Sequence, residues 1–154
     1  MNETGDAASM VGDPPALDAR RTFPGVPEQC REARLWARSV MRPFPDAADA
    51  VEVVVSEFFG NAVRHTASGG PGGVVDVELT GGYGAPVRLT VVDQGACADR
   101  PATAARVLAP TLSRPDGRGL FLAAALSSEW GRAPHDGTGA MATWAEFPTE
   151  RSRS

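Results

Sequence analysis

One segment, AADAVEVVVSEFFGNAVRH, constrains the fold of this chain more than any other, because it reads as a long helix with a single apolar face. At about 100° per residue, four of its apolar positions fall within an arc of roughly 40–60°. These positions are Val51, Val55, Phe58 and Ala62. The helix is expected to take Asp46 as its N-cap and to end before the glycines and proline at 69–73. Its apolar stripe must therefore pack against another layer of structure.

Two strands are predicted directly after this helix. Residues 74–80 read VVDVELT and alternate apolar and polar side chains from Val75, which is the period of a strand with one wet face. Residues 87–92 read VRLTVV, and the glycine-rich turn at 81–84 would join the two strands into an antiparallel hairpin. The helix and the hairpin together indicate a sheet that has helices on one face.

The rest of the chain extends this pattern into an α+β fold, a two-layer α/β sandwich with a mainly antiparallel sheet and helices on one face. The other expected elements are an edge strand at 20–23, a helix at 27–41, a weak helix at 102–109, an apolar helix at 120–126, and strands at 128–132 and 140–147. Residues 1–18 are expected to be a flexible leader, 19–148 a single domain and 149–154 a tail.

Composition narrows the classes of function. Apolar residues make up 42% and charged residues 22% of the 154 positions, as in one soluble globular domain. Basic residues number 15 and acidic residues 19, and the resulting net charge of −4 argues against direct binding of nucleic acid. All the basic residues are arginine, so mechanisms that need a lysine are excluded.

The sequence also predicts a cytoplasmic protein without membrane contact. Cys30 and Cys97 are too few for a disulfide scaffold and are expected to be reduced thiols. The N-terminus lacks the apolar core of a signal peptide. The densest late apolar run, at 120–126, is far shorter than the ~20 residues of a membrane span.

Glu57 and Asn61 lie one helical turn apart at the border of the apolar stripe, so their side chains project together. A carboxylate at this border could deprotonate a nucleophile, and an amide oxygen is a hard ligand suited to Mg²⁺. The alternative is a solvated polar pair on the helix surface. His65, near the end of the same helix, is expected to complement the helix dipole.

Two glycine-containing segments are further candidates for a site. Asp93 and Gly95 follow an apolar strand, where a carboxylate can accept a hydrogen bond from the amine of a base such as adenine and glycine permits close approach of a flat ring. The alternative is a strand-ending turn. Gly117, Arg118 and Gly119 precede an apolar helix and could bind phosphate through N–H groups and a guanidinium, the alternative being a flexible loop. This second segment lacks the lysine of a P-loop.

These segments occur in an order that resembles the ATP-binding domain of the GHKL superfamily, the histidine-kinase-like ATPases. The matching stretches are SEFFGNAVRHT, VVDQG and GRGLFLAAALSSEWG. The resemblance covers about residues 20–148. Small single-domain versions of this kind look like the anti-sigma-factor serine/threonine kinases of GC-rich bacteria.

The resemblance implies an α/β sandwich with a mixed, mostly antiparallel sheet that holds ATP between sheet and helices. Glu57 would be the general base acting on a serine hydroxyl of a partner, and Asn61 would bind the Mg²⁺ that bridges the phosphates. Asp93 would bind the adenine amine, Gly95 would pack near the ring, and residues 96–116 would form the ATP lid. The residues that would hold the phosphates at the helix start are Gly117, Arg118, Gly119 and Leu120.

Two positions depart from the family pattern. The first glycine box is often D-x-G-x-G, but Cys97 stands at its second glycine position. The last strand often carries a threonine at the adenine pocket, and alignment places Ala142 there, with Thr143 facing the other side of the strand. Because lysine is absent, Arg114 and Arg118 are the candidate cations for the phosphates.

Two function classes follow from the resemblance. The first is a serine/threonine kinase that phosphorylates an anti-anti-sigma partner and sequesters a sigma factor, and family members of this kind often form homodimers. The second is a non-catalytic regulator, nucleotide-gated or nucleotide-independent, that only binds its partner. Retention of Glu57 favours the kinase, because a pure binder needs no base. A detached histidine-kinase catalytic domain is a weaker reading, since no dimerisation helix with a phospho-accepting histidine precedes residue 20.

Overall fold

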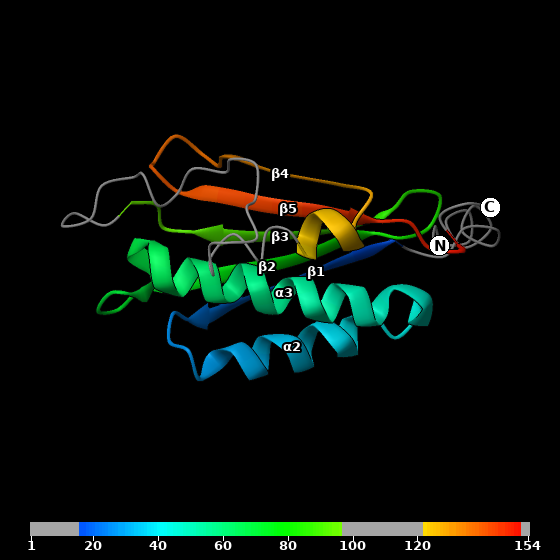
Figure 1. Cartoon of the computed structure of the whole chain (residues 1–154), viewed down its shortest axis with the longest axis horizontal. Helices are drawn as coiled ribbons and strands as arrows, with labels where there is room; N and C mark the ends of the chain where they lie inside the picture. The colour runs from blue at the N-terminus through cyan, green and yellow to red at the C-terminus, as the bar shows by residue number, and fades with distance from the viewer. Residues whose placement is uncertain (1–15, 97–121, 152–154) are drawn as a thin grey trace, which may run out of the picture.

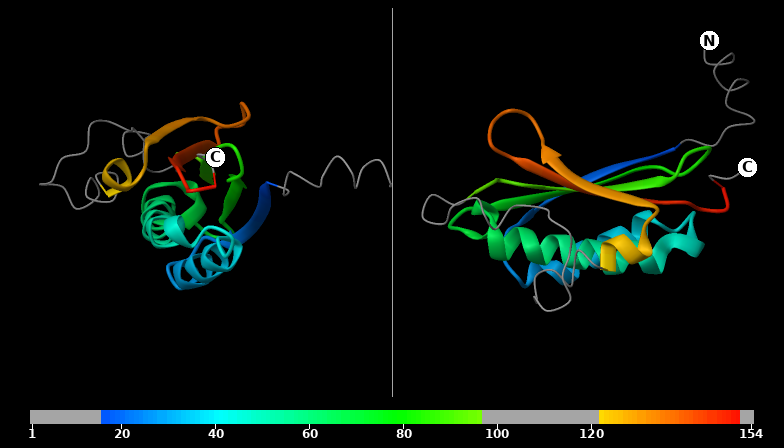
Figure 2. Two further views of the ribbon diagram at one scale, coloured as in Figure 1. Left: turned by 90° about the vertical axis from the view of Figure 1, so that its right-hand side faces the viewer. Right: turned by 45° about the horizontal axis from the view of Figure 1, so that its top comes forward.

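The computed structural model describes residues 16–96 and 122–151, and its elements lie in two layers (Figure 1). In chain order they are β1 (Leu17–Pro24), α2 (Gln29–Val40), α3 (Pro45–His65), the short 3-10 turn η1 (Ala67–Gly69), β2 (Val74–Gly81), β3 (Val87–Asp93), β4 (Glu129–Pro134) and β5 (Met141–Phe147). The strands form one sheet, and α2 and α3 cover one of its faces, which confirms the α+β sandwich (Figure 2). None of the helices in the described ranges is long and apolar enough to span a membrane.

The strand order in the sheet is β1-β2-β3-β5-β4, and each of these four pairings is antiparallel. β2 and β3 form the predicted hairpin, in which Val77 pairs with Val91. β5 joins the other side of β3, so that Thr143 lies opposite Val91. The resemblance implied a mixed sheet, but no parallel pair occurs among the described strands. The reason is that β4 and β5 form a hairpin whose second strand returns against β3.

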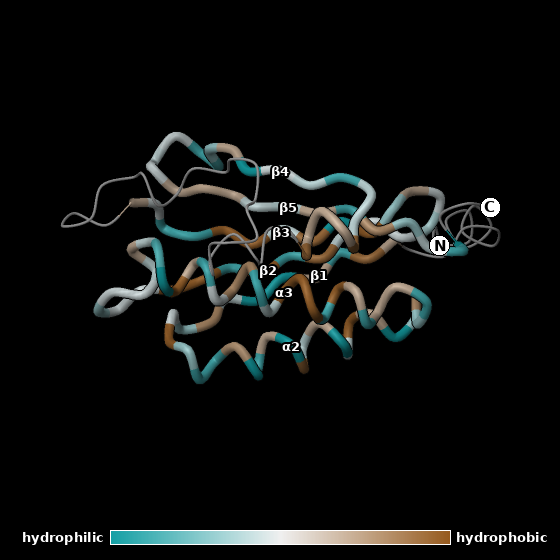
Figure 3. The backbone as a smooth tube through the Cα atoms, in the orientation of Figure 1, coloured by the Kyte–Doolittle hydropathy of each residue, from teal (hydrophilic) through white to brown (hydrophobic). Residues whose placement is uncertain are grey.

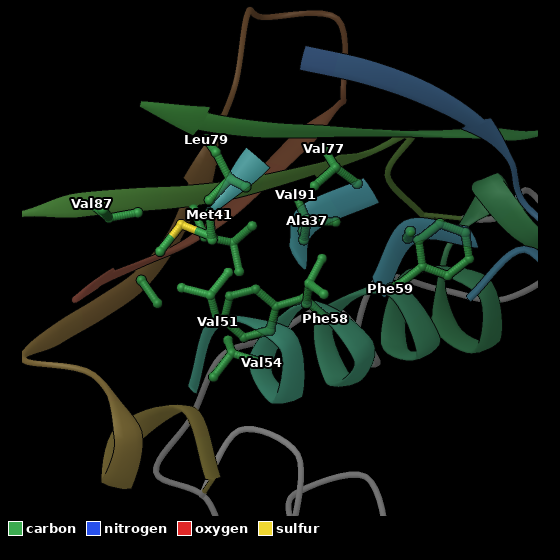
Figure 4. Packing of buried hydrophobic residues seen from close by; sticks show 14 of the residues in the cluster. Ala37, Met41, Val51, Val54, Phe58, Phe59, Val77, Leu79, Val87 and Val91 are labelled. Carbon is green, nitrogen blue, oxygen red and sulfur yellow. The ribbon is translucent and has the colours of Figure 1, made fainter. Parts of the chain in front are cut away.

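The core lies between the sheet and the two helices (Figure 4). The predicted stripe of α3 is buried there. Hydrophobic and hydrophilic residues alternate along both helices (Figure 3). The sheet contributes alternate residues of β2 and β3, as the period-two pattern predicts. These are Val75, Val77, Leu79, Val87, Leu89 and Val91. Full burial of one such side chain stabilises the fold by about 1.5–3 kcal/mol relative to exposure.

β1 is longer than the sequence predicts. It starts at Leu17 instead of Arg20, because its backbone pairing continues along the whole of β2. Phe23 is the fully buried residue of this edge strand, and its first four residues alternate only between half-buried and exposed. The predicted leader, 1–18, therefore overlaps the strand.

The start of α3 also differs from the prediction. Phe44 is the N-cap and Pro45 occupies the first turn, a position that suits the fixed φ of proline, so Asp46 lies inside the helix. The Asp46 carboxylate accepts a hydrogen bond of 2.9 Å from the backbone N–H of Glu150 instead of capping the helix. The predicted tail, 149–154, thus begins in contact with the domain.

The C-terminal elements agree with the sequence. The strands predicted at 128–132 and 140–147 are β4 and β5. The helix predicted at 120–126 is present over 122–126, the part of it that the structure describes. The weak helix predicted at 102–109 lies outside the described residues.

Candidate functional site

The C-terminal ends of α3 and β3 meet at one end of the sandwich, at the left in Figure 1. The backbone N–H of Ala67, just after α3, donates a hydrogen bond of 2.7 Å to the carbonyl oxygen of Gly95, just after β3. Asn61 lies about one turn before the end of α3, and Asp93 is the last residue of β3. The fold therefore brings these two candidate residues to the same end of the molecule.

The backbone is closely packed where the end of α3 meets the end of β3. The Oγ of buried Ser68 accepts the backbone N–H of Gln94 at 2.9 Å. A Cβ on Gly73 would lie 2.0 Å from the carbonyl oxygen of Ser68, so a side chain cannot fit there. Gly95 has a φ of 85°, and its Cβ would lie 2.1 Å from the carbonyl oxygen of Gly139. The absent side chain of Gly95 thus makes room for the turn between β4 and β5.

That turn is held by its own hydrogen bonds. The Oδ1 of Asp136 accepts the backbone N–H of Thr138 at 3.0 Å and also accepts the Thr138 hydroxyl. These bonds, the side-chain bond from Thr138 first, lower the pKa of the exposed Asp136 carboxyl below its ordinary value. The turn is therefore a defined structure that can present Gly139 to Gly95 in one position.

Asp93 is a buried carboxylate, with 2% of its side chain exposed. Its Oδ1 accepts the backbone N–H of Gly95 at 2.7 Å. Its Oδ2 accepts a hydrogen bond of 2.8 Å from Nη1 of Arg132. A carboxylate can stay charged in such a place because a guanidinium and an amide compensate it. The part of the predicted site that would bind the adenine base, here called the base end, is thus built around a buried ion pair.

Arg132 lies on β4, directly opposite Thr143 of β5, and its Nη1 also donates to Oγ1 of Thr143 at 2.7 Å. Thr143 is buried, and its partner on β3 is buried Val91. The sequence-based placement of Thr143 on the far face, with Ala142 at the pocket, is therefore wrong. The register with β3 sets Ala142 beside Val92 on the outer face and Thr143 on the helix side.

Glu57 and Asn61 are both half-buried on α3, as predicted for residues that border the core. The Oδ1 of Asn61 accepts a hydrogen bond of 2.9 Å from Nη2 of Arg64. Glu57 forms no ion pair or hydrogen bond within 16–96 and 122–151. Its carboxylate therefore carries no compensating partner in that part of the chain.

The second glycine segment lies outside the described residues. This applies to Gly117, Arg118, Gly119 and Leu120, to the predicted lid from residue 97 onward, and to Cys97 and Arg114. Their predicted roles stay predictions.

The described residues fit a nucleotide with Mg²⁺ at this end of the fold. Asp93 is a buried acceptor of the kind that an amine of a base needs, and Asn61 offers a hard oxygen on the neighbouring helix. In the described ranges, no group of three or more His, Cys, Asp or Glu side chains could hold a metal. A magnesium ion at Asn61 would therefore depend on phosphate oxygens for further ligands, which is the usual way that Mg²⁺ binds with nucleotides.

Three residues of this end were not predicted as site residues. Arg132 is separated from Asp93 by 39 residues, and no spacing rule connects them. For Thr143 a signal existed, because strand alternation puts it on the same face as the apolar residues Ala145 and Phe147. Arg64 follows Asn61 by three residues on the same helix, which is a spacing at which side chains meet.

Comparison with known proteins agrees with this geometry. A family model for the histidine kinase-like ATPase domain matches residues 23–144. Among solved structures, a chain in the crystal structure of the SiaB-SiaC complex from Pseudomonas aeruginosa is similar, with a TM-score of 0.60. It is 18% identical, and the match covers 96% of this chain and 100% of that chain, so the likeness shows the fold alone. No curated protein matches the sequence.

Proposed function

Because the chain belongs to the histidine kinase-like ATPase family, we propose that it is an ATP-dependent regulatory serine/threonine kinase of the anti-sigma-factor type. The buried Asp93 carboxylate is the observation that carries this proposal, since it ends β3 beside the helix that bears Glu57 and Asn61. The buried acceptor Asp93 suits the adenine base, and the amide oxygen of Asn61 suits a magnesium ion. The carboxylate of Glu57, which has no partner among the described residues, suits proton transfer.

Each site residue within the described ranges has one task in this proposed mechanism. Asp93 accepts the adenine amine, with Gly95 beside the base, and Asn61 holds Mg²⁺. When bound, ATP supplies the phosphoryl group. Glu57 removes the proton from a serine hydroxyl of the partner, and the site otherwise acts by positioning and by neutralising charge. The residues proposed to hold the phosphates from beyond the described ranges are Gly117, Arg118, Gly119 and Leu120, under a lid at 96–116.

Arg64 adds a cation to this set. Its Nη2 lies 2.9 Å from Oδ1 of Asn61, which is the proposed ligand of Mg²⁺. The chain has no lysine, so arginine is the candidate side-chain cation for the phosphates. Arg64 therefore joins Arg114 and Arg118 as a candidate for that task.

A protein partner is part of the proposal. One solved structure of similar fold is that of the SiaB-SiaC complex, which supports a protein-binding role for this fold. We propose a sigma factor and an anti-anti-sigma antagonist as partners, with homodimerisation and a cytoplasmic location. The net charge of −4 argues against direct contact with nucleic acid or an anionic membrane surface.

A non-catalytic regulator is the second candidate function. The observation that favours it is the hydrogen bond from Arg132 to Oδ2 of Asp93, because this chain's own side chain then takes an acceptor that adenine would use. Partner binding would in that case be nucleotide-gated or nucleotide-independent. Phosphotransfer to a serine of an anti-anti-sigma protein distinguishes the two candidates.

The first test is calorimetric titration of the chain with ATP, with and without Mg²⁺, beside the variant Asp93→Asn. We expect binding that Mg²⁺ strengthens and a lower affinity in the variant, because a hydrogen bond to a charged acceptor disappears. Asp76→Asn is the matched control, since Asp76 lies on β2 and forms an ion pair with Arg20 of β1. Equal affinity in Asp93→Asn and the wild type would contradict the proposed site.

A further inference from the structure

Two acceptors of the proposed nucleotide site carry hydrogen bonds from arginines of the same chain. Oδ1 of Asn61 accepts from Arg64, and Oδ2 of Asp93 accepts from Arg132. The two arginines differ in burial: Arg64 is exposed, whereas 10% of the Arg132 side chain is exposed. Water replaces an exposed contact at little cost, but separating a buried ion pair leaves an uncompensated charge. The contact at Asp93 is therefore the one that a ligand has to overcome.

Both oxygens of Asp93 already have donors, and the carboxylate is 2% exposed. Arg132 is held in this position by a second bond, since its Nη1 also donates to Oγ1 of Thr143. Charge-assisted hydrogen bonds are about twice as strong as neutral ones. The neutral amine of adenine is thus a weaker donor than the guanidinium that stands in its place.

We propose that Arg132 closes the base end of the nucleotide site, so that its side chain must leave Oδ2 of Asp93 before an adenine amine can bind there. This inference rests on the proposed function, because it names the residue that opposes ATP at the same site. Arg132 is then a residue that sets nucleotide affinity and base selectivity. While Arg132 holds Asp93, a nucleotide that carries adenine binds only slightly more tightly than a nucleotide whose base has no amine.

The test compares Arg132→Met and Arg132→Gln with the wild type. Methionine keeps much of the length of arginine and has no donor, whereas glutamine keeps a neutral donor. Arg88→Met is the matched control, because Arg88 also forms an ion pair, with Glu146 at 2.9 Å, and its guanidinium stacks over Trp144. Each protein is titrated by calorimetry with ATP-Mg²⁺ and with purine riboside triphosphate, which lacks the amine.

The proposal predicts that Arg132→Met binds ATP at least about tenfold more tightly than the wild type, the factor that one hydrogen bond to a charged group contributes. The same variant should prefer ATP over purine riboside triphosphate by at least about tenfold, and the wild type by less. Arg88→Met should behave like the wild type in both titrations.

Loss of Arg132 leaves the buried carboxylate of Asp93 with one donor fewer, which can destabilise the fold. The thermal unfolding of each variant is therefore measured without nucleotide, beside the titrations. If Arg132→Met does not fold, Arg132→Gln carries the test, and the same direction of change is expected at smaller size. If the wild type binds ATP and a folded Arg132 variant binds it equally or less tightly, Arg132 does not close the site, and the proposed function stands. If neither the wild type nor a folded variant binds millimolar ATP, both the inference and the proposed function are wrong.

Discussion

Arg132 on β4 donates a hydrogen bond of 2.8 Å to Asp93 at the end of β3, although 39 residues separate the two in the chain. The bond passes over β5, which lies between their strands and contributes Thr143 as a second acceptor. The guanidinium of Arg132 therefore joins three neighbouring strands, on the face of the sheet that the helices cover and at the end of the sheet where β3 ends. The same contact stabilises the edge of the sheet and occupies the base end of the proposed site.

Replacing Thr143 by valine should weaken this junction. Valine keeps the shape of threonine but removes the acceptor for Nη1 of Arg132, so the free energy of unfolding is expected to fall by about 0.5–1.5 kcal/mol in urea denaturation. Thr90→Val is the control, because Thr90 lies on the outer face of β3 and should change stability by no more than about 0.5 kcal/mol. Equal effects of the two substitutions would mean that the Arg132 bond contributes nothing measurable.

Gly95→Ala and Gly137→Ala form a matched pair at two glycines of positive φ. Gly95 has a φ of 85° and Gly137 a φ of 81°. A Cβ on Gly95 would lie 2.1 Å from the carbonyl oxygen of Gly139, whereas no atom of the described residues lies within 4 Å of a Cβ on Gly137. We expect Gly137→Ala to cost about 1–2 kcal/mol from the backbone conformation alone. Gly95→Ala should cost clearly more, measured as a larger fall in Tm. Similar losses in both variants would mean that the turn moves aside easily.

Glu57→Gln should separate binding from phosphotransfer. The substitution removes the proposed base without touching the nucleotide, so ATP affinity should stay within about twofold of the wild type while transfer slows by about 10²–10⁴-fold. Radiolabelled ATP and a panel of purified anti-anti-sigma proteins provide the assay. Glu52→Gln, on the same helix and paired with Arg38, is the control and should keep full transfer. Transfer by Glu57→Gln at the wild-type rate would remove Glu57 from the mechanism.

Asn61→Ala should abolish the dependence of ATP binding on Mg²⁺. With the amide oxygen gone, the metal loses its proposed protein ligand, so affinity in Mg²⁺ should drop to the value measured without the metal. Affinity without Mg²⁺ should stay the same, because the substitution leaves the proposed adenine contact at Asp93 unchanged. Persistent strengthening by Mg²⁺ in this variant would place the metal on other residues.

Leu89→Ala tests the core that supports the site. Leu89 is fully buried in the centre of β3, and its truncation should cost about 2–5 kcal/mol of unfolding free energy. Leu35→Ala is the matched control, because 48% of Leu35 is exposed on α2, and its loss should be within about 0.5 kcal/mol. A small loss at Leu89 would show that β3 is not the packed centre of the sheet.

Local patterns predicted much of the fold. The stripe of α3 was read from a period of 3.6 residues and the β2–β3 hairpin from a period of two, and both are present. The start of β1 was not predicted, because the length of this edge strand follows from its pairing with β2 and not from a local pattern. The prediction that Asp46 caps α3 was wrong, because Phe44 is the N-cap and the helix already starts at Pro45.

The sequence by itself determined which residues lie on one face of one element. Glu57 and Asn61 share a helix face because the helical repeat is local, and Asp93 ends a strand whose pattern is equally local. Only the tertiary structure decided that Arg132 meets Asp93 and that Thr143 faces the helices. The register between strands far apart in the chain sets these neighbours, and a slip of one residue reverses the face of every side chain in a strand.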